Sequence, residues 1–188
     1  MYIDVRSIFI ALPILIINPA AAIANTTLDS FTNGSSVIWT TYTTTTIVPG
    51  VKGFLWILDA GQWREVYAGP ALTLAPWCEA SLGLGIERDA STVAPRFAGS
   101  AWFGNGSLSW ITVIEYGSLG GAWYLSTLTQ KINGISFGVR AKRFVGEGLY
   151  GEWQSLESLS LYGVGYLFDF EAFKGFTPKY ELGFRLTI

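Results

Sequence analysis

The chain offers few residues for acid–base or nucleophilic chemistry. It has no histidine, the commonest general base and a frequent metal ligand. A Ser-His-Asp triad therefore cannot be assembled. Two carboxylate pairs, Asp169 with Glu171 and Glu79 with Glu87, remain as candidates for acid–base work. Because these carboxylates lie in or beside strand-like segments, we interpret them as structural charges. We predict no catalytic residue and no enzyme activity.

Metal, disulfide and nucleic-acid chemistry are also poorly supported. Cys78 is the single cysteine, so neither a disulfide nor a zinc–thiolate site can form within the chain. The carboxylates show no dense Asp/Asn/Gly calcium loop. Twelve Lys and Arg face fourteen Asp and Glu, a formal net charge of -2 that leaves no basic excess to meet phosphates. We expect no metal, no cofactor and no nucleic-acid partner.

Charges instead recur at every second position of strand-like segments. In 178–188, Tyr180, Leu182, Phe184, Leu186 and Ile188 alternate with polar, charged or glycine residues. Strand side chains alternate with period 2, so one face is apolar and the other polar. Segments 78–88, 135–142 and 162–170 show the same division, with Tyr162, Val164 and Tyr166 assigned to the apolar face.

The character of the two faces favours a barrel with lipid outside. Aromatics are 15% of the chain and charged residues only 14%, where a soluble domain carries about 25%. One face is rich in Tyr, Trp, Phe and Leu, and the other is small and glycine-rich with charges of both signs. Small residues relieve crowding inside a narrow barrel, and opposite charges there can pair. The predicted lumen-lining charges are Glu65, Glu79, Glu87, Arg96, Glu115, Arg140, Lys142, Lys179, Glu181 and Arg185.

The first 24 residues have the pattern of a secretory signal. Residues 8–17 form a short apolar run, Pro19 interrupts it, and Ala22-Ile23-Ala24 supplies a small-x-small cleavage pattern. We predict cleavage after Ala24. The alternative is an uncleaved anchor, although the run is short for a spanning helix.

Together these features resemble the small outer-membrane β-barrel proteins of Gram-negative bacteria. The resemblance lies in the signal peptide, the alternating strands and the terminal strand 178–188. That strand resembles the C-terminal signal read by the barrel-insertion machinery, carried by Tyr180, Leu182, Phe184, Leu186 and Ile188. The chain departs from the class at Ile188, where Phe or Trp is usual, and Phe184 partly compensates.

The expected fold is an all-β, antiparallel up-and-down transmembrane barrel. Eleven strand-like segments can be identified: 36–48, 51–59, 63–74, 77–87, 95–104, 107–116, 121–131, 135–144, 148–153, 158–170 and 178–188. Bacterial single-chain barrels normally have an even number of strands. We therefore expect ten, either with 135–153 as one bent strand or with 36–48 outside the wall, while eight and twelve stay open. The expected organisation is a signal peptide 1–24, a flexible segment 25–35 and one barrel domain 36–188.

The predicted function is that of an integral outer-membrane barrel with a structural or passive small-solute role. Its expected partners are outer-membrane lipid, the insertion machinery and small solutes. The alternative is a soluble exported barrel that binds an apolar ligand in its interior, as lipocalin-like proteins do. In that case the Tyr, Phe and Leu faces would line the cavity and the charges would face water.

Overall fold

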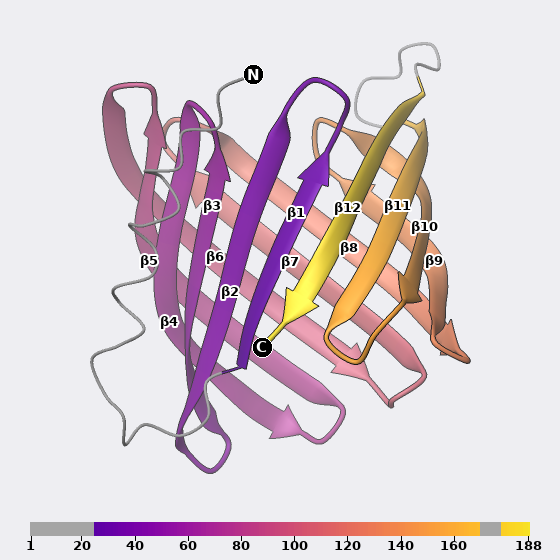
Figure 1. The fold of residues 1–188 in the computed structure, drawn as a ribbon. Coiled ribbons are helices and arrows are strands. Elements are labelled where there is room, and N and C mark those ends of the chain that lie inside the picture. Colours follow the sequence, from indigo (N-terminus) through magenta and orange to yellow (C-terminus); the bar gives the residue numbers. More distant parts are fainter. Residues whose placement is uncertain (1–24, 170–177) are drawn as a thin grey trace.

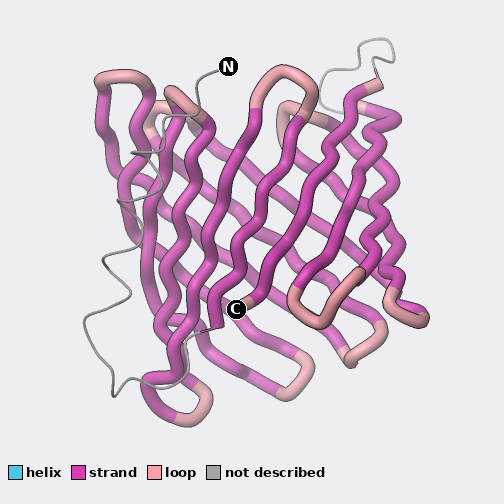
Figure 2. The backbone as a smooth tube through the Cα atoms, in the orientation of Figure 1, coloured by secondary structure: helices cyan, strands magenta, loops and turns pink. Residues whose placement is uncertain are grey.

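The computed structural model describes residues 25–169 and 178–188, which form one antiparallel sheet closed into a barrel of twelve strands (Figure 1). Figure 2 shows the tilted strands joined by turns, with no helix among the described residues. The strands are β1 (Asn25–Thr32), β2 (Val37–Val48), β3 (Val51–Ala60), β4 (Trp63–Ala75), β5 (Cys78–Asp89), β6 (Thr92–Gly104), β7 (Leu108–Gly117), β8 (Gly121–Ile132), β9 (Ile135–Lys142), β10 (Gly146–Gln154), β11 (Leu159–Phe168) and β12 (Lys179–Thr187).

Each strand pairs with its neighbours in sequence, and β1 pairs with β12 to close the ring. At the seam the amide of Thr26 donates to the carbonyl of Ile188 at 3.0 Å, and the amide of Ile188 donates back at 2.8 Å. Both ends of the described chain therefore lie at one end of the barrel, the terminal end, beside each other in Figure 1. We call the opposite end the distal end. Closure leaves no sheet edge with unpaired backbone groups.

The expected strand number of ten is wrong, because residues 25–35 contain a strand that the sequence analysis did not identify. We expected a flexible segment there, but Asn25–Thr32 is β1 and pairs along its length with β2. The even number is reached by adding this strand to the eleven identified segments rather than by removing one. Segment 36–48 contributes β2 to the wall, and 135–153 folds as the β9–β10 hairpin instead of one bent strand. The signal segment 1–24 and residue 170 lie outside the described residues.

Short turns connect the strands at both ends of the barrel. All but one have two to four residues, and the exception joins β11 to β12 at the distal end. Asn133 and Gly134, which form the turn between β8 and β9, have φ values of 49° and 81°. Two successive positive φ values are the mark of a type I′ turn, whose twist matches that of the flanking strands.

The two faces of the wall have opposite character. Along β5, Leu82 and Leu84 are 72% and 68% exposed, whereas Glu87 on the other face is 0% exposed. The outward residues near the strand centres are mostly aliphatic. Outward aromatics gather towards the ends: Trp77, Trp110 and Trp153 at the terminal end, and Trp39, Tyr116, Phe168 and Tyr180 at the distal end.

Glycines on the inner face make room for large side chains. A Cβ added at Gly83 would lie 2.8 Å from the ring of Phe54, and one added at Gly183 would lie 2.6 Å from the ring of Tyr162. Both distances are below van der Waals contact, so larger residues would displace these rings. The small inner face is therefore needed to fill the barrel with aromatic and charged side chains.

Candidate functional site

The interior of the barrel gathers most of the predicted lumen-lining charges. Glu65, Glu87, Arg96, Glu115 and Glu181 are at most 5% exposed. Buried charges of this kind persist only when they are paired and hydrogen-bonded. The described residues meet that condition through three ionic networks.

The first, the Arg96 network, lies towards the distal end on β4 to β7. Arg96 carries its guanidinium between three carboxylates. Its Nη2 lies 3.1 Å from Glu65, its Nε donates to Glu115 at 3.1 Å, and its Nη1 donates to Glu87. The turn between β7 and β8 covers the network, because the amide of Leu119 donates to Glu87 at 2.6 Å. Three carboxylates thus share one guanidinium and several neutral donors.

Two neutral aromatic donors complete this network. The indole of Trp63 donates to Glu65 at 2.5 Å, and the hydroxyl of Tyr67 donates to Glu115 at 2.6 Å. The ring of Trp63 also lies under the guanidinium of Arg96, 5.8 Å from its carbon. Sequence reasoning identified the four charged members but missed Trp63 and Tyr67. The available signal was their place two residues before Glu65 and two after it, on the same face of β4.

The second, the Glu181 network, lies across the barrel on β9, β11 and β12. The ammonium of Lys142 donates to Glu181 at 2.5 Å, Arg140 lies 3.6 Å from the same carboxylate, and the hydroxyl of Tyr166 donates to it at 3.0 Å. The guanidinium of Arg140 also lies 4.6 Å from the ring centre of Tyr150. Here two cations share one carboxylate, the reverse of the Arg96 network.

The third, the Arg185 network, lies nearer the terminal end. Arg185 contacts Glu152 at 3.1 Å and Asp29 at 3.2 Å. Tyr150 donates to Glu152 at 2.5 Å, and Tyr162 donates to Asp29 at 2.6 Å. Sequence analysis did not select Asp29 or Glu152. Asp29 was missed because its strand was taken for a flexible segment. Glu152 carried a usable signal, the alternation of glycine, tyrosine and glutamate along β10.

The face of β11 that we expected to be the apolar outer face points into the barrel instead. Tyr162, Val164 and Tyr166 are 6%, 3% and 1% exposed and form an interior cluster with Tyr150. The outward positions of this strand include Gly163 and Gly165 instead. Tyrosine rings fill space like other aromatics, but a buried hydroxyl requires a polar partner. Interior carboxylates supply it here, Asp29 for Tyr162 and Glu181 for Tyr166.

The two other predicted lumen charges are more accessible. Glu79 pairs with Lys52 at 2.6 Å, and the side chains are 22% and 37% exposed. Lys179 is exposed at the distal mouth, where its ammonium donates to the carbonyl of Phe144 at 3.0 Å.

The residues of the expected C-terminal signal lie on the outer face of β12. Tyr180, Leu182 and Phe184 are 50%, 57% and 37% exposed, Leu186 is half-buried, and Ile188 is 68% exposed. The ring of Phe184 meets Trp39 across the β1 strand at a centre distance of 6.0 Å. The outer surface is thus continuously apolar across the closing seam at these positions.

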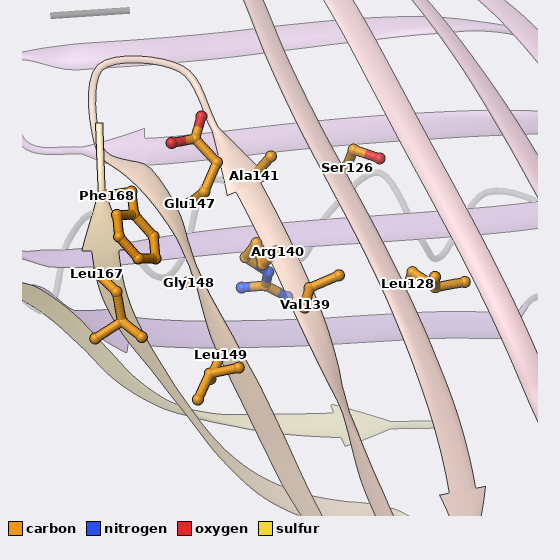
Figure 3. A pocket seen from close by; sticks show the side chains of 10 residues that line it. All are labelled: Ser126, Leu128, Val139, Arg140, Ala141, Glu147, Gly148, Leu149, Leu167 and Phe168. Atoms are coloured by element: carbon orange, nitrogen blue, oxygen red, sulfur yellow. The ribbon is translucent and has the colours of Figure 1, made fainter. Parts of the chain in front are cut away.

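A shallow groove of about 300 Å³ runs along the outer wall over β8 to β11. Figure 3 shows its lining, with the aliphatic side chains of Leu128 on β8, Val139 on β9, Leu149 on β10 and Leu167 on β11. The groove exists because small residues stand between large aliphatic ones. Arg140 and Glu147 also border the groove, and most of the other lining residues are aliphatic or small.

The described residues show neither a metal-binding group of side chains nor a membrane-spanning helix. Within 25–169 and 178–188 no three Cys, Asp or Glu side chains are grouped so that they could hold a metal ion. No helix in this part of the chain is long and apolar enough to cross a membrane. Cys78 is a buried free cysteine.

In comparisons with known proteins, no family model matches this chain and no curated protein matches it.

Proposed function

We propose that the protein is an integral outer-membrane β-barrel whose filled interior mainly stabilises the closed sheet. The observation that carries this proposal is the inversion of polarity between the two faces. Leu82 and Leu84 lie exposed outside, while Glu87 and Arg96 are buried inside. A barrel wall in lipid needs an apolar outer band with aromatic residues at both edges and tolerates charge only inside. A water-soluble barrel with an apolar cavity would need the opposite distribution.

The aromatic residues at the strand ends give the proposal a second support. Tyr and Trp prefer the boundary between hydrocarbon and water, because one end of each ring system is apolar and the other hydrogen-bonds. The terminal-end and distal-end aromatics flank a band of exposed Leu, Ile and Val. This spacing fits a membrane whose two surfaces meet the two ends of the barrel.

The experiment is expression of the full chain in a Gram-negative host, followed by fractionation and gel electrophoresis with and without heating. We expect recovery in the outer-membrane fraction and a band that changes mobility on heating, because closed barrels resist unfolding in cold detergent. Recovery in the soluble fraction without detergent would refute the proposal.

Passive permeation of small solutes is a second candidate. It is favoured by the accessible charges near the terminal end, where the Lys52 and Arg185 side chains are 37% and 30% exposed. Purified protein in planar bilayers would then give small, reproducible conductance steps. A current that never exceeds background would leave the structural role and remove the permeation role.

A further inference from the structure

The turn between β7 and β8, residues 118–120, is fastened to the Arg96 network at the distal end. The amide of Leu119 donates to Oε1 of Glu87 at 2.6 Å, and the amide of Gly120 donates to the same oxygen at 3.4 Å. Glu87 lies on β5, 32 residues before Leu119, and is 0% exposed. One buried carboxylate from a distant strand therefore fixes the position of this turn.

The β9–β10 turn, at the same end of the barrel, is held differently. There the amide of Val145 donates to the carbonyl of Lys142 at 3.1 Å, a bond within the turn itself. Among the described residues, neither Leu119 nor Gly120 donates to a backbone carbonyl. The position of 118–120 thus depends on a side chain of the interior, whereas the β9–β10 turn has a backbone bond of its own.

Glycines let the β7–β8 turn lie directly on the network. A Cβ added at Gly117 would overlap the carboxylate of Glu87, and one added at Gly120 would lie 2.9 Å from the ring of Trp63. Gly121, where β8 begins, has a φ of 68°, which glycine adopts without strain. The turn therefore covers the network with its backbone, and the glycines beside it can absorb the change in backbone angles that lifting it requires.

The network beneath the turn is stabilised by contact with water. Glu65, Glu87 and Glu115 surround the single guanidinium of Arg96, so the network has a formal excess of two negative charges. Excess charge is costly when it is buried away from water, and hydration lowers that cost. The bonds to Glu87 favour the closed position of the turn, and hydration of the carboxylates favours an open one.

From these observations we propose that the β7–β8 turn is a lid, fastened by Glu87, that closes the distal side of the lumen above the Arg96 network. When the lid opens, water and small cations reach the interior from the distal end, whereas the excess negative charge repels anions. Lids of this kind move about hinges of a few residues. The inference concerns the closed barrel and does not depend on its location in a membrane.

The test measures how fast a thiol beneath the lid reacts with charged reagents. Ala98 lies on β6 two residues after Arg96, pairs with Glu115 and is 7% exposed. Ala98→Cys supplies the thiol, and Cys78→Ser removes the natural one. The purified barrel in zwitterionic detergent is treated with a cationic methanethiosulfonate or with its anionic analogue, and the modified fraction is followed by mass spectrometry.

Two variants release the lid, and each has a matched control. Leu119→Pro leaves the network unchanged but removes the N–H that donates to Glu87, whereas Leu119→Ala keeps it. Glu87→Ala removes the acceptor of the same bond. Its control is Glu79→Ala, which removes a carboxylate that pairs with Lys52 near the terminal end. The heat-dependent gel shift of each variant reports whether the barrel is closed.

We expect Leu119→Pro and Glu87→Ala to speed modification by the cationic reagent at least tenfold, and both controls to change it less than twofold. In the opened variants the anionic reagent should react more slowly than the cationic one. An unchanged rate in a closed Leu119→Pro barrel would overturn the inference, as would equal acceleration in Leu119→Ala. Should Leu119→Pro not form a closed barrel, the comparison of Glu87→Ala with Glu79→Ala decides by the same criteria. Equal rates for the two reagents would overturn the preference for cations. Membrane fractionation of the unmodified protein tests the proposed function separately.

Discussion

Replacing Arg96 with methionine should strongly destabilise the barrel. The substitution keeps a long side chain but removes the guanidinium that pairs with Glu65, Glu87 and Glu115. These carboxylates are 5%, 0% and 3% exposed, so water cannot replace the lost donors. Removing one partner of a buried ion pair costs about 3–5 kcal/mol. With three carboxylates left around a neutral side chain, we expect the upper part of that range.

The measurement is urea unfolding of the barrel refolded into lipid vesicles, followed by tryptophan fluorescence and by the heat-dependent gel shift. At a slope of about 2 kcal/mol per M urea, the loss for Arg96→Met corresponds to a midpoint lower by about 2 M. Glu65→Gln is the informative comparison. It removes one of three like charges and keeps an acceptor for the indole of Trp63, so its midpoint should stay near that of the unmodified protein.

An unchanged midpoint for Arg96→Met would refute the reasoning, because it would mean that the Arg96 network contributes no stability. A large loss in Glu65→Gln would refute a narrower point, that this network carries more carboxylates than its cation needs.

Three further substitutions test other parts of the fold. Leu84 lies on the outer face near the centre of β5, and Leu84→Arg should lower the stability of the inserted barrel by about 2–4 kcal/mol. Leu84→Phe is the control and should fold into vesicles as the unmodified protein does. Equal folding of the two variants would contradict a lipid-facing position. Tyr166→Phe removes the hydroxyl that donates to Glu181 and should cost about 1.5–3 kcal/mol in urea unfolding, and an unchanged midpoint would show that this bond contributes nothing. Gly83→Val should destabilise the barrel by about 1–3 kcal/mol, because the added Cβ would press on the Phe54 ring. It should also make interior tryptophan more accessible to a polar fluorescence quencher. A more stable protein would mean that the interior has free space beside Gly83.

Period-2 alternation was sufficient to predict the fold class and most of the wall. It worked well where one face is aliphatic and the other charged, as in β5 and β12. It failed for β1, whose sequence NTTLDSFT mixes polar and apolar residues on both faces. Its strand conformation depends on pairing with β2 and β12, which are distant contacts that no local pattern reports.

The charged residues of the interior could be predicted from the sequence, but the tyrosines that contact them could not. Glu87 and Arg96 could be assigned to the lumen because the prediction placed lipid outside the wall, where an unpaired charge is costly. Tyr162 and Tyr166 could not, because tyrosine is acceptable both at a membrane surface and in a polar interior. Their burial at 6% and 1% follows from carboxylates on neighbouring strands, so the assignment of β11 depended on tertiary partners.

The arrangement of the networks around the ring bears on what could pass through the barrel. The Arg96 network spans β4 to β7, and the Glu181 network spans β9 to β12, which the strand order places across the lumen from it. The first has more carboxylates than cations and the second more cations than carboxylates. At the distal end one wall thus carries a negative excess and the facing wall a positive excess. Opposite charge excesses on facing walls attract each other, which favours the closed sheet. The three networks together hold six carboxylates and four cations, and their mutual pairing is what the proposed structural role of the interior requires.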